Sequence, residues 1–107
     1  MLYFDFEAGN KTYKLRLNTR NTVALEKALG CNPLSIFGAG DTIPTITTMV
    51  QILWASMQQY HHGITLNDAY DIFDAYLEEH SATDFIPVIL EIYKVSGIIR
   101  EGATEKN

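Results

Sequence analysis

Cysteine is nearly absent from this chain of 107 residues, and no long uninterrupted apolar run occurs in it. The single Cys31 cannot form an internal disulfide, and the sequence does not open with a charged segment followed by an apolar one, so we expect a reducing cytoplasm rather than secretion. The longest uncharged stretch, residues 42–67, is interrupted by threonine, serine and glutamine and is too polar for a membrane span. We therefore expect a soluble protein without a membrane partner.

Positive charge is missing from the larger part of the chain. Residues 28–93 contain no lysine or arginine, whereas most of the acidic residues fall there, and the net charge is −5. Binding to nucleic acid requires a basic stripe interleaved with stacking aromatic side chains, and the few basic residues at positions 11–27 make a poor one. We therefore expect no nucleic-acid partner.

Motifs for catalysis and metal binding are also missing. Cys31 stands between Gly30 and Asn32, a position typical of a spacer between two helices, and nothing in the sequence brings to it the histidine that a thiol nucleophile needs. Residues 61 and 62 are adjacent histidines whose side chains diverge on a helix and chelate one metal poorly. Residues 38–41 lack the lysine and hydroxyl of a phosphate-binding loop. We expect no catalytic residue, cofactor or metal, and keep as an alternative a small enzyme that uses Cys31 or a histidine–carboxylate site.

What the chain does contain is a large apolar fraction, 47% of its residues, which is enough for one core. We expect a single domain over residues 1–100 and a frayed tail over residues 101–107. Residues 2–17 alternate with period two around Gly9-Asn10, which predicts a β-hairpin with a two-residue turn. The predicted apolar pairs are Phe6–Tyr13, Phe4–Leu15 and Leu2–Leu17, and the pairs on the other face are Asp5–Lys14, Glu7–Thr12 and Tyr3–Arg16.

After the hairpin the apolar period becomes helical. A helix capped by Asn18 or Thr19 is predicted to end before Gly30, and Pro33 opens a short helical turn over residues 34–37. Longer helices are predicted over residues 43–62, from Thr65 to about residue 79, and over residues 85–99 with Asp84 as the cap and Pro87 in the first turn. The expected fold is α+β and mostly helical, with an N-terminal β-hairpin packed on a bundle of about four helices.

Two helix faces are candidate interaction surfaces. The helix over residues 43–62 is predicted to bury a regular apolar stripe that comprises Ile46, Met49, Val50, Leu53, Trp54, Met57 and Tyr60. Its opposite face is polar but uncharged, which suits a protein partner as well as it suits water. That face comprises Thr47, Thr48, Gln51, Ala55, Gln58 and Gln59, among which Thr48, Gln51 and Gln58 are our candidates.

The helix after Thr65 is amphipathic and acidic. Its predicted buried stripe is Leu66, Ala69, Tyr70, Phe73, Tyr76 and Leu77. The candidate interaction residues on the opposite face are Asp68, Asp71, Asp74 and Glu78. Like charges at this helical spacing repel, and a basic partner would relieve the repulsion, although a simply solvated face is the alternative interpretation. The last helix is so apolar that more than one of its faces must be covered, and we expect it to carry surplus apolar surface.

Together these segments resemble the small tail assembly chaperones of long-tailed bacteriophages and prophages. The resemblance covers roughly residues 13–99 and includes the segment LEKALG, an Asn-Pro-Leu restart, the segment from Thr65 to Tyr76, and the ending EIYKVSGI. The residues that carry it are Leu25, Glu26, Leu29, Gly30, Pro33, Leu34, Asp71, Tyr76, Glu91, Tyr93 and Gly97.

The resemblance implies a non-enzymatic protein of the host bacterial cytoplasm that binds the tape-measure protein, keeps it soluble during tail assembly and is absent from the mature virion. The residues fit this role, because surplus apolar helix surface, an uncharged helix face, an acidic stripe and a hairpin with both outer edges open are features of a protein that forms a homo-oligomer and holds a client. Many such families also make a longer product by ribosomal frameshifting. Residues 105–107, Glu-Lys-Asn, could be encoded by GAA AAA AAC, which contains the slippery heptamer A AAA AAC. The alternative is a structural virion subunit, such as a head–tail joining or tail-completion protein.

Overall fold

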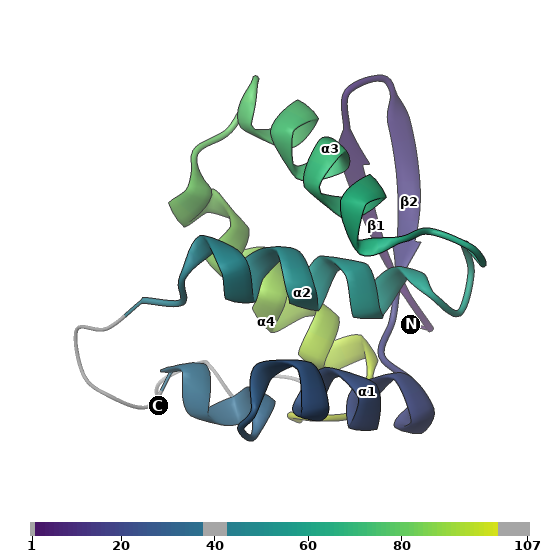
Figure 1. The fold of residues 1–107 in the computed structure, drawn as a ribbon, viewed down its shortest axis with the longest axis vertical. Coiled ribbons are helices and arrows are strands. Elements are labelled where there is room, and N and C mark those ends of the chain that lie inside the picture. The colour runs from purple at the N-terminus through teal and green to yellow at the C-terminus, as the bar shows by residue number, and fades with distance from the viewer. Residues whose placement is uncertain (1, 38–42, 101–107) are drawn as a thin grey trace.

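The chain folds into an N-terminal β-hairpin followed by helices, and the computed structural model describes residues 2–37 and 43–100 (Figure 1). The elements are β1 (Phe4–Ala8), β2 (Lys11–Leu15), α1 (Thr19–Leu29), the 3-10 helix η1 (Pro33–Phe37), α2 (Ile46–Met57), α3 (Leu66–Leu77), the 3-10 helix η2 (Ala82–Asp84) and α4 (Phe85–Val95). The predicted α+β class is confirmed. The predicted loop at Gly38, Gly40 and Asp41 and the predicted tail lie outside the described residues.

The hairpin has the predicted register. Phe6 pairs with Tyr13 and Asp5 with Lys14 in an antiparallel ribbon closed by Gly9 and Asn10. Gly9 has a φ of +63°, whereas no residue other than glycine has a positive φ among those described, so the turn has the left-handed first residue of a type II′ hairpin. The predicted pairs Leu2–Leu17 and Tyr3–Arg16 lie beyond the strand bounds, and Leu2 is 67% exposed whereas Leu17 is buried.

Helix α1 begins and ends at the predicted residues. The Asn18 side chain accepts a hydrogen bond from the backbone N–H of Asn21, and Gly30 closes the helix with a φ of +72°. Beyond Cys31, the Asn32 side chain accepts from the N–H of Leu34 at the start of η1. Local capping chemistry therefore decides where the chain turns between α1 and η1.

Helix α2 is shorter than the predicted range of residues 43–62. Pro44 disfavours helical geometry at Ile43, and Thr45 acts as the cap by accepting from the N–H of Thr48. At the other end the last turn tightens, with the N–H of Gln58 donating to the carbonyl of Ala55. Residues 58–63 then form turns that lead to α3.

Helix α3 carries the predicted capping box. The Thr65 hydroxyl accepts from the N–H of Asp68 at 3.0 Å, and the Asp68 carboxylate accepts from the N–H of Thr65 at 2.9 Å. Its buried face is narrower than predicted and consists of Ala69, Phe73 and Tyr76. Tyr70 and Leu77 are 44% and 38% exposed, because no neighbouring element covers that edge of the helix.

Helix α4 ends at Val95 rather than at residue 99. Gly97 has a φ of +78°, and the N–H groups of Gly97 and Ile98 donate to the carbonyls of Lys94 and Tyr93, which is a Schellman stop. At its start, the Asp84 side chain does not cap α4 but accepts from the N–H of Ser81, so the turn of η2 runs directly into the helix. Pro87 lies in the first turn, as predicted.

Helix α2 crosses the middle of the molecule (Figure 1). Helices α1, α3 and α4 all pack on it, and the hairpin packs on α2, α3 and α4. The core therefore collects side chains from all of these elements, and α4 is covered on more than one face, as predicted. Among the described residues, no helix combines the length and the apolar character that crossing a membrane would require.

Candidate interaction surface

The two outer edges of the hairpin differ. The edge of β2 is covered towards the end of the strand, because the N–H of Lys14 donates to Nε2 of His61 at 2.8 Å and, just past the strand, the N–H of Arg16 donates to the carbonyl of Ser56 at 2.8 Å. Further bonds fasten the end of the hairpin: the Arg16 guanidinium donates to the carbonyl of Val95 at 2.7 Å. Nearer the hairpin tip, the outward N–H and C=O of Thr12 make no hydrogen bond to the described residues.

The edge of β1 is open. The N–H of Lys14 points away from β1, so Asp5 and Lys14 face each other without hydrogen bonds between them. Bonded and non-bonded pairs alternate along an antiparallel ribbon, so Glu7 and Thr12 are also a non-hydrogen-bonded pair. The backbone N–H and C=O of Asp5 and Glu7 therefore point outward. None of these four groups has a hydrogen-bond partner within residues 2–37 and 43–100.

A shallow groove of about 270 Å³ runs along this open edge. It is lined by Phe4, Asp5, Phe6, Glu7, Tyr76, His80 and Val88. Its walls therefore come from β1, from the end of α3 and from α4, and they combine apolar side chains with the two carboxylates of β1. We call this feature the β1 edge groove.

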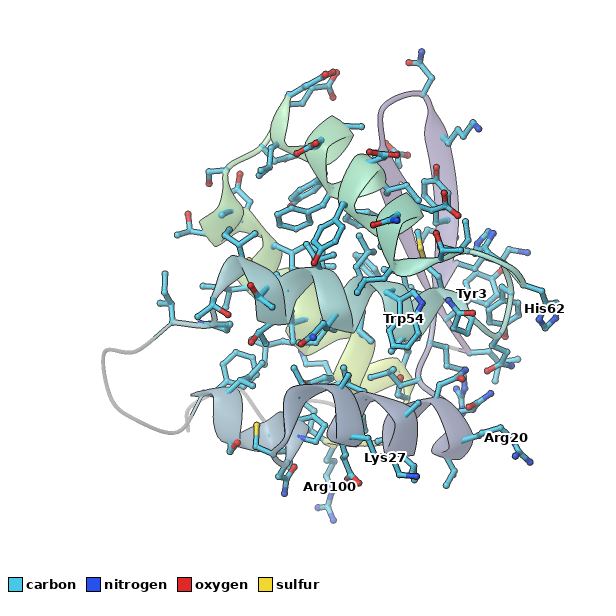
Figure 2. All side chains as sticks on the ribbon, viewed as in Figure 1. Tyr3, Arg20, Lys27, Trp54, His62 and Arg100 are labelled. Atoms are coloured by element: carbon cyan, nitrogen blue, oxygen red, sulfur yellow. The ribbon has the colours of Figure 1, made fainter. Side chains whose placement is uncertain are left out.

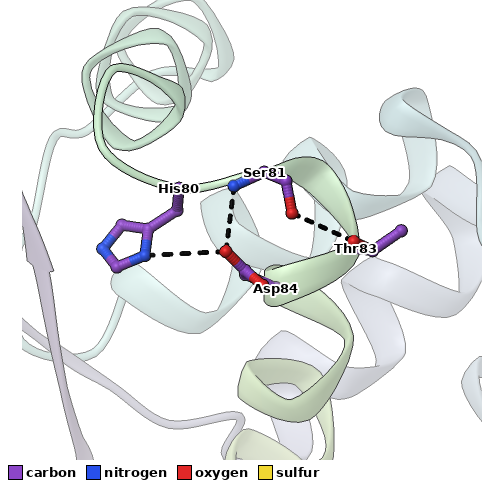
Figure 3. A network of polar contacts seen from close by, with 4 residues as sticks. All are labelled: His80, Ser81, Thr83 and Asp84. Carbon is purple, nitrogen blue, oxygen red and sulfur yellow. Dashed lines mark hydrogen bonds and ion pairs between the residues drawn. The ribbon is translucent and has the colours of Figure 1, made fainter.

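A polar network holds the segment between α3 and α4, whose His80 lines the groove (Figure 3). The ring of His80 stacks on that of Tyr76 with centroids 4.5 Å apart, and Nδ1 of His80 lies 3.8 Å from Oδ2 of Asp84. The same carboxylate oxygen accepts from the N–H of Ser81, whose hydroxyl lies 3.0 Å from that of Thr83. Burial, helped by the charge of Asp84, raises the pKa of Tyr76, so the groove wall carries a neutral phenol.

The predicted acidic residues lie on α3, but they do not share one environment. Asp71, Asp74 and Glu78 are exposed, and Asp71 lines a second groove of about 330 Å³ between α3 and the tip of the hairpin, opposite Lys11. Asp68 faces the helix start, where it belongs to the capping box. Three of the four carboxylates are therefore free of a structural role within the described part of the chain.

The predicted uncharged face of α2 is only partly a surface. Thr48 and Gln51 are half-buried, and the Gln58 amide donates to the carbonyls of Trp54 and Ile64, so Gln58 is used to close the end of the helix. Gln59 accepts from the Asn18 amide at 3.4 Å. The structure does not bring Thr48, Gln51 or Gln58 to the β1 edge groove.

Three residues of α2 depart from the predicted sides of the helix. Ile46, predicted in the buried stripe, is 47% exposed at the start of the helix. Ala55, predicted on the outer face, is 1% exposed, whereas Trp54, predicted in the core, is half-buried and lies on the outer side of the helix (Figure 2). The reason is that several helices pack around α2, so only a narrow face of this helix is open to solvent, and it is not the face that the sequence pattern predicts. A single apolar stripe is the wrong template for such a central helix.

Exposed apolar side chains lie elsewhere than on the last helix. Surplus apolar surface was expected on α4, but none of its large apolar residues is exposed, since neighbours cover them at least in part. Among the described residues, the exposed large apolar side chains are Leu2, Val23, Leu34, Ile43, Ile46, Tyr70 and Leu77. Ile43 and Ile46 lie close together in the sequence at the start of α2, and Tyr70 and Leu77 flank the exposed acidic residues of α3.

The remaining candidates for chemistry are separate from one another. Cys31 is exposed at the corner after α1. His61 is neutral at physiological pH because burial, and then the charge of Lys14, lowers the pKa of its imidazole. No three side chains of the metal-ligating types come together within residues 2–37 and 43–100.

Comparison with protein families, with curated proteins and with solved structures finds no match to this chain.

Proposed function

We propose that this chain is a bacteriophage tail assembly chaperone that binds the tape-measure protein and keeps it soluble while the tail is assembled. In this proposal the chain acts as a homo-oligomer in the host bacterial cytoplasm and is absent from the mature virion. It starts from the resemblance of the helical corners and segments described above, which covers most of the domain.

The observation that supports it best is the open edge of β1. A chaperone for a long unassembled chain must hold extended segments without catalysing a reaction, and a strand edge with free N–H and C=O groups can do this for many sequences. The exposed apolar pair Tyr70 and Leu77 beside the carboxylates of α3 offers further contact area for such a client.

Co-expression with the tape-measure protein tests the proposal. The soluble fraction of that protein is expected to rise when this chain is present and to stay low with a variant that cannot fold, such as Leu53→Asp in the fully buried core. Equal soluble fractions with the intact chain and with the Leu53→Asp variant would contradict the proposal.

Localisation separates the chaperone from a structural subunit. Purified mature particles are expected to lack this chain, whereas lysates of infected or induced cells contain it. Detection of the chain in mature particles would instead favour a head–tail joining or tail-completion protein. The proposed frameshift is decided by the codons of residues 105–107, because GAG or AAG at either of the first two positions removes the slippery heptamer.

A further inference from the structure

The open edge of β1 presents a defined set of hydrogen-bonding groups. Asp5 and Glu7 each direct one N–H and one C=O outward, two residues apart, in the spacing of a ladder for one more strand. An antiparallel strand placed there pairs two of its residues directly with Asp5 and Glu7. The occupant that satisfies all four groups is therefore an extended segment.

Charge on the outer face selects among extended segments. The side chains of Asp5 and Glu7 are exposed, and neither makes an ion pair within the described part of the chain. Lys14, which lies opposite Asp5, places its ammonium 4.9 Å from the ring of Tyr3 instead. Two carboxylates at the edge thus remain without a cation.

A second copy of β1 does not fit this edge. If two β1 strands paired antiparallel about Phe6, Asp5 of each copy would lie opposite Glu7 of the other. Like charges directly opposite each other destabilise a sheet. The same two positions favour lysine or arginine in a different strand. The acidic edge therefore excludes self-pairing and admits a basic segment.

The other face of the added strand meets the groove. Side chains between the basic positions point to the opposite face, where Phe4, Tyr76 and Val88 line the β1 edge groove. These neighbours are apolar or aromatic, and the phenol of Tyr76 is neutral. Apolar side chains of moderate size suit that wall.

We infer that the outer edge of β1 binds an extended segment that alternates basic and apolar residues, as an added antiparallel strand. The inference rests on the proposed function in one respect: it gives the chemistry of the client segment that the chaperone would hold. The strand addition itself is a property of the isolated domain and is tested without the client.

The probe is a six-residue peptide that alternates lysine and valine, capped at both ends. Titrated into the ¹⁵N-labelled protein, it is expected to shift the amide resonances of Asp5 and Glu7 and to slow their hydrogen exchange. A peptide with glutamate in place of lysine should bind about tenfold more weakly, because two favourable cross-strand pairs become repulsive. No shift at Asp5 and Glu7 at millimolar peptide, or equal binding of the glutamate peptide, would overturn the inference.

N-methylation separates strand addition from charge attraction. In the antiparallel arrangement the lysine N–H groups point to β1, so N-methyl groups on the lysines should weaken binding about tenfold through the loss of backbone hydrogen bonds. The same groups on the valines leave those bonds intact and should have little effect. Equal binding of the two methylated peptides would reduce the contact to electrostatics and contradict an added strand.

Charge reversal in the protein gives the matched test. A β1 variant with Asp5→Lys and Glu7→Lys should prefer the glutamate peptide. The control is an α3 variant with Asp74→Lys and Glu78→Lys, which changes the net charge by the same amount and should still prefer the lysine peptide. If the α3 variant reverses the preference instead, the site lies on α3 and the inference is wrong. If the β1 variant still solubilises the tape-measure protein fully, the β1 edge does not hold the client, and that part of the inference is wrong while the proposed function stands. If the peptides bind as expected but the client stays insoluble with the wild-type chain, the proposed function fails alone.

Discussion

His61 accepts a hydrogen bond through Nε2 from the backbone N–H of Lys14, 47 residues earlier in the chain, at 2.8 Å. This bond fastens the turn after α2 to the outer edge of β2, and the ring of His61 also packs edge-on against Tyr13 with centroids 5.4 Å apart. Together with the bond from the N–H of Arg16 to the carbonyl of Ser56, the bond from Lys14 to His61 covers the end of β2, whereas Asp5 and Glu7 of β1 have no such contact among the described residues.

The first prediction concerns pH. The pKa of His61 is lowered in the folded chain by burial and then by the charge of Lys14, so the unfolded chain takes up a proton first as the pH falls. The stability that His61 contributes is present above its ordinary pKa of about 6.5 and is lost as the pH falls below that value toward the lower pKa of the folded state. The protonated ring also cannot accept from the N–H of Lys14. Urea unfolding should therefore show a fall in stability below about pH 6.5.

Two variants check this assignment. His61→Gln, whose amide oxygen can still accept a bond without titrating, should reduce the loss of stability in that window. His62→Gln, at the exposed neighbouring position, should leave the pH profile unchanged. The same profile in the wild type and in His61→Gln would show that another group is responsible.

The second prediction concerns the buried hydroxyl of Tyr93. It donates to the carbonyl of Pro33 at 3.0 Å and joins α4 to η1 across 60 residues, and burial raises the pKa of the phenol well above its usual range. Tyr93→Phe should cost about 1–2 kcal/mol in the free energy of unfolding, since the carbonyl is left without a partner. Tyr70→Phe, at a position 44% exposed, is the matched control and should change stability by less than about 0.5 kcal/mol in the same denaturation experiment. Equal effects of the two variants would mean that the bond does not stabilise the fold.

The third prediction concerns the different roles of Asp68 and Asp74, two carboxylates that the sequence pattern assigns to the same face of α3. Asp68 completes the capping box of α3, whereas Asp74 makes no hydrogen bond to the described residues. Asp68→Ala should therefore lower the thermal midpoint, and Thr65→Ala, which removes the other half of the box, should cost about 1 kcal/mol. Asp74→Ala should leave the midpoint unchanged or raise it, because one like-charge repulsion is removed. A larger loss from Asp74→Ala than from Asp68→Ala would contradict this division of roles.

Features that depend on neighbours in the sequence could be predicted from the sequence. The hairpin register follows from two patterns that agree, the apolar pairs and the Asp5–Lys14 pair, and the starts of α1 and α3 follow from caps within three residues of their partners. The stop of α4 before Gly97 was missed, because the predicted helix ran to residue 99, although its signal, a glycine after a run of apolar residues, is equally local.

Features that depend on distant contacts could not be predicted. The difference between the two hairpin edges is made by His61 and Ser56, which no local pattern links to β2. The prediction left both edges open, and the β1 edge groove likewise needs α3 and α4 to build its walls. The acidic row on α3 was visible in the sequence, but its division between capping and surface required the structure.

The fourth prediction tests the orientation of α2, which the sequence pattern gave wrongly at Ala55. Ala55 is 1% exposed, so Ala55→Gln adds volume and an amide to a packed site and should cost about 2–4 kcal/mol in urea unfolding. Gln51→Ala, one turn away on the half-buried outer side, should change stability by less than about 0.5 kcal/mol. If α2 were turned as a single apolar stripe suggests, Ala55→Gln would be tolerated on the surface and the two variants would be equally stable. A large loss from Ala55→Gln alone would show that the side of α2 that carries Ala55 is enclosed, as expected of a helix on which α1, α3 and α4 all pack.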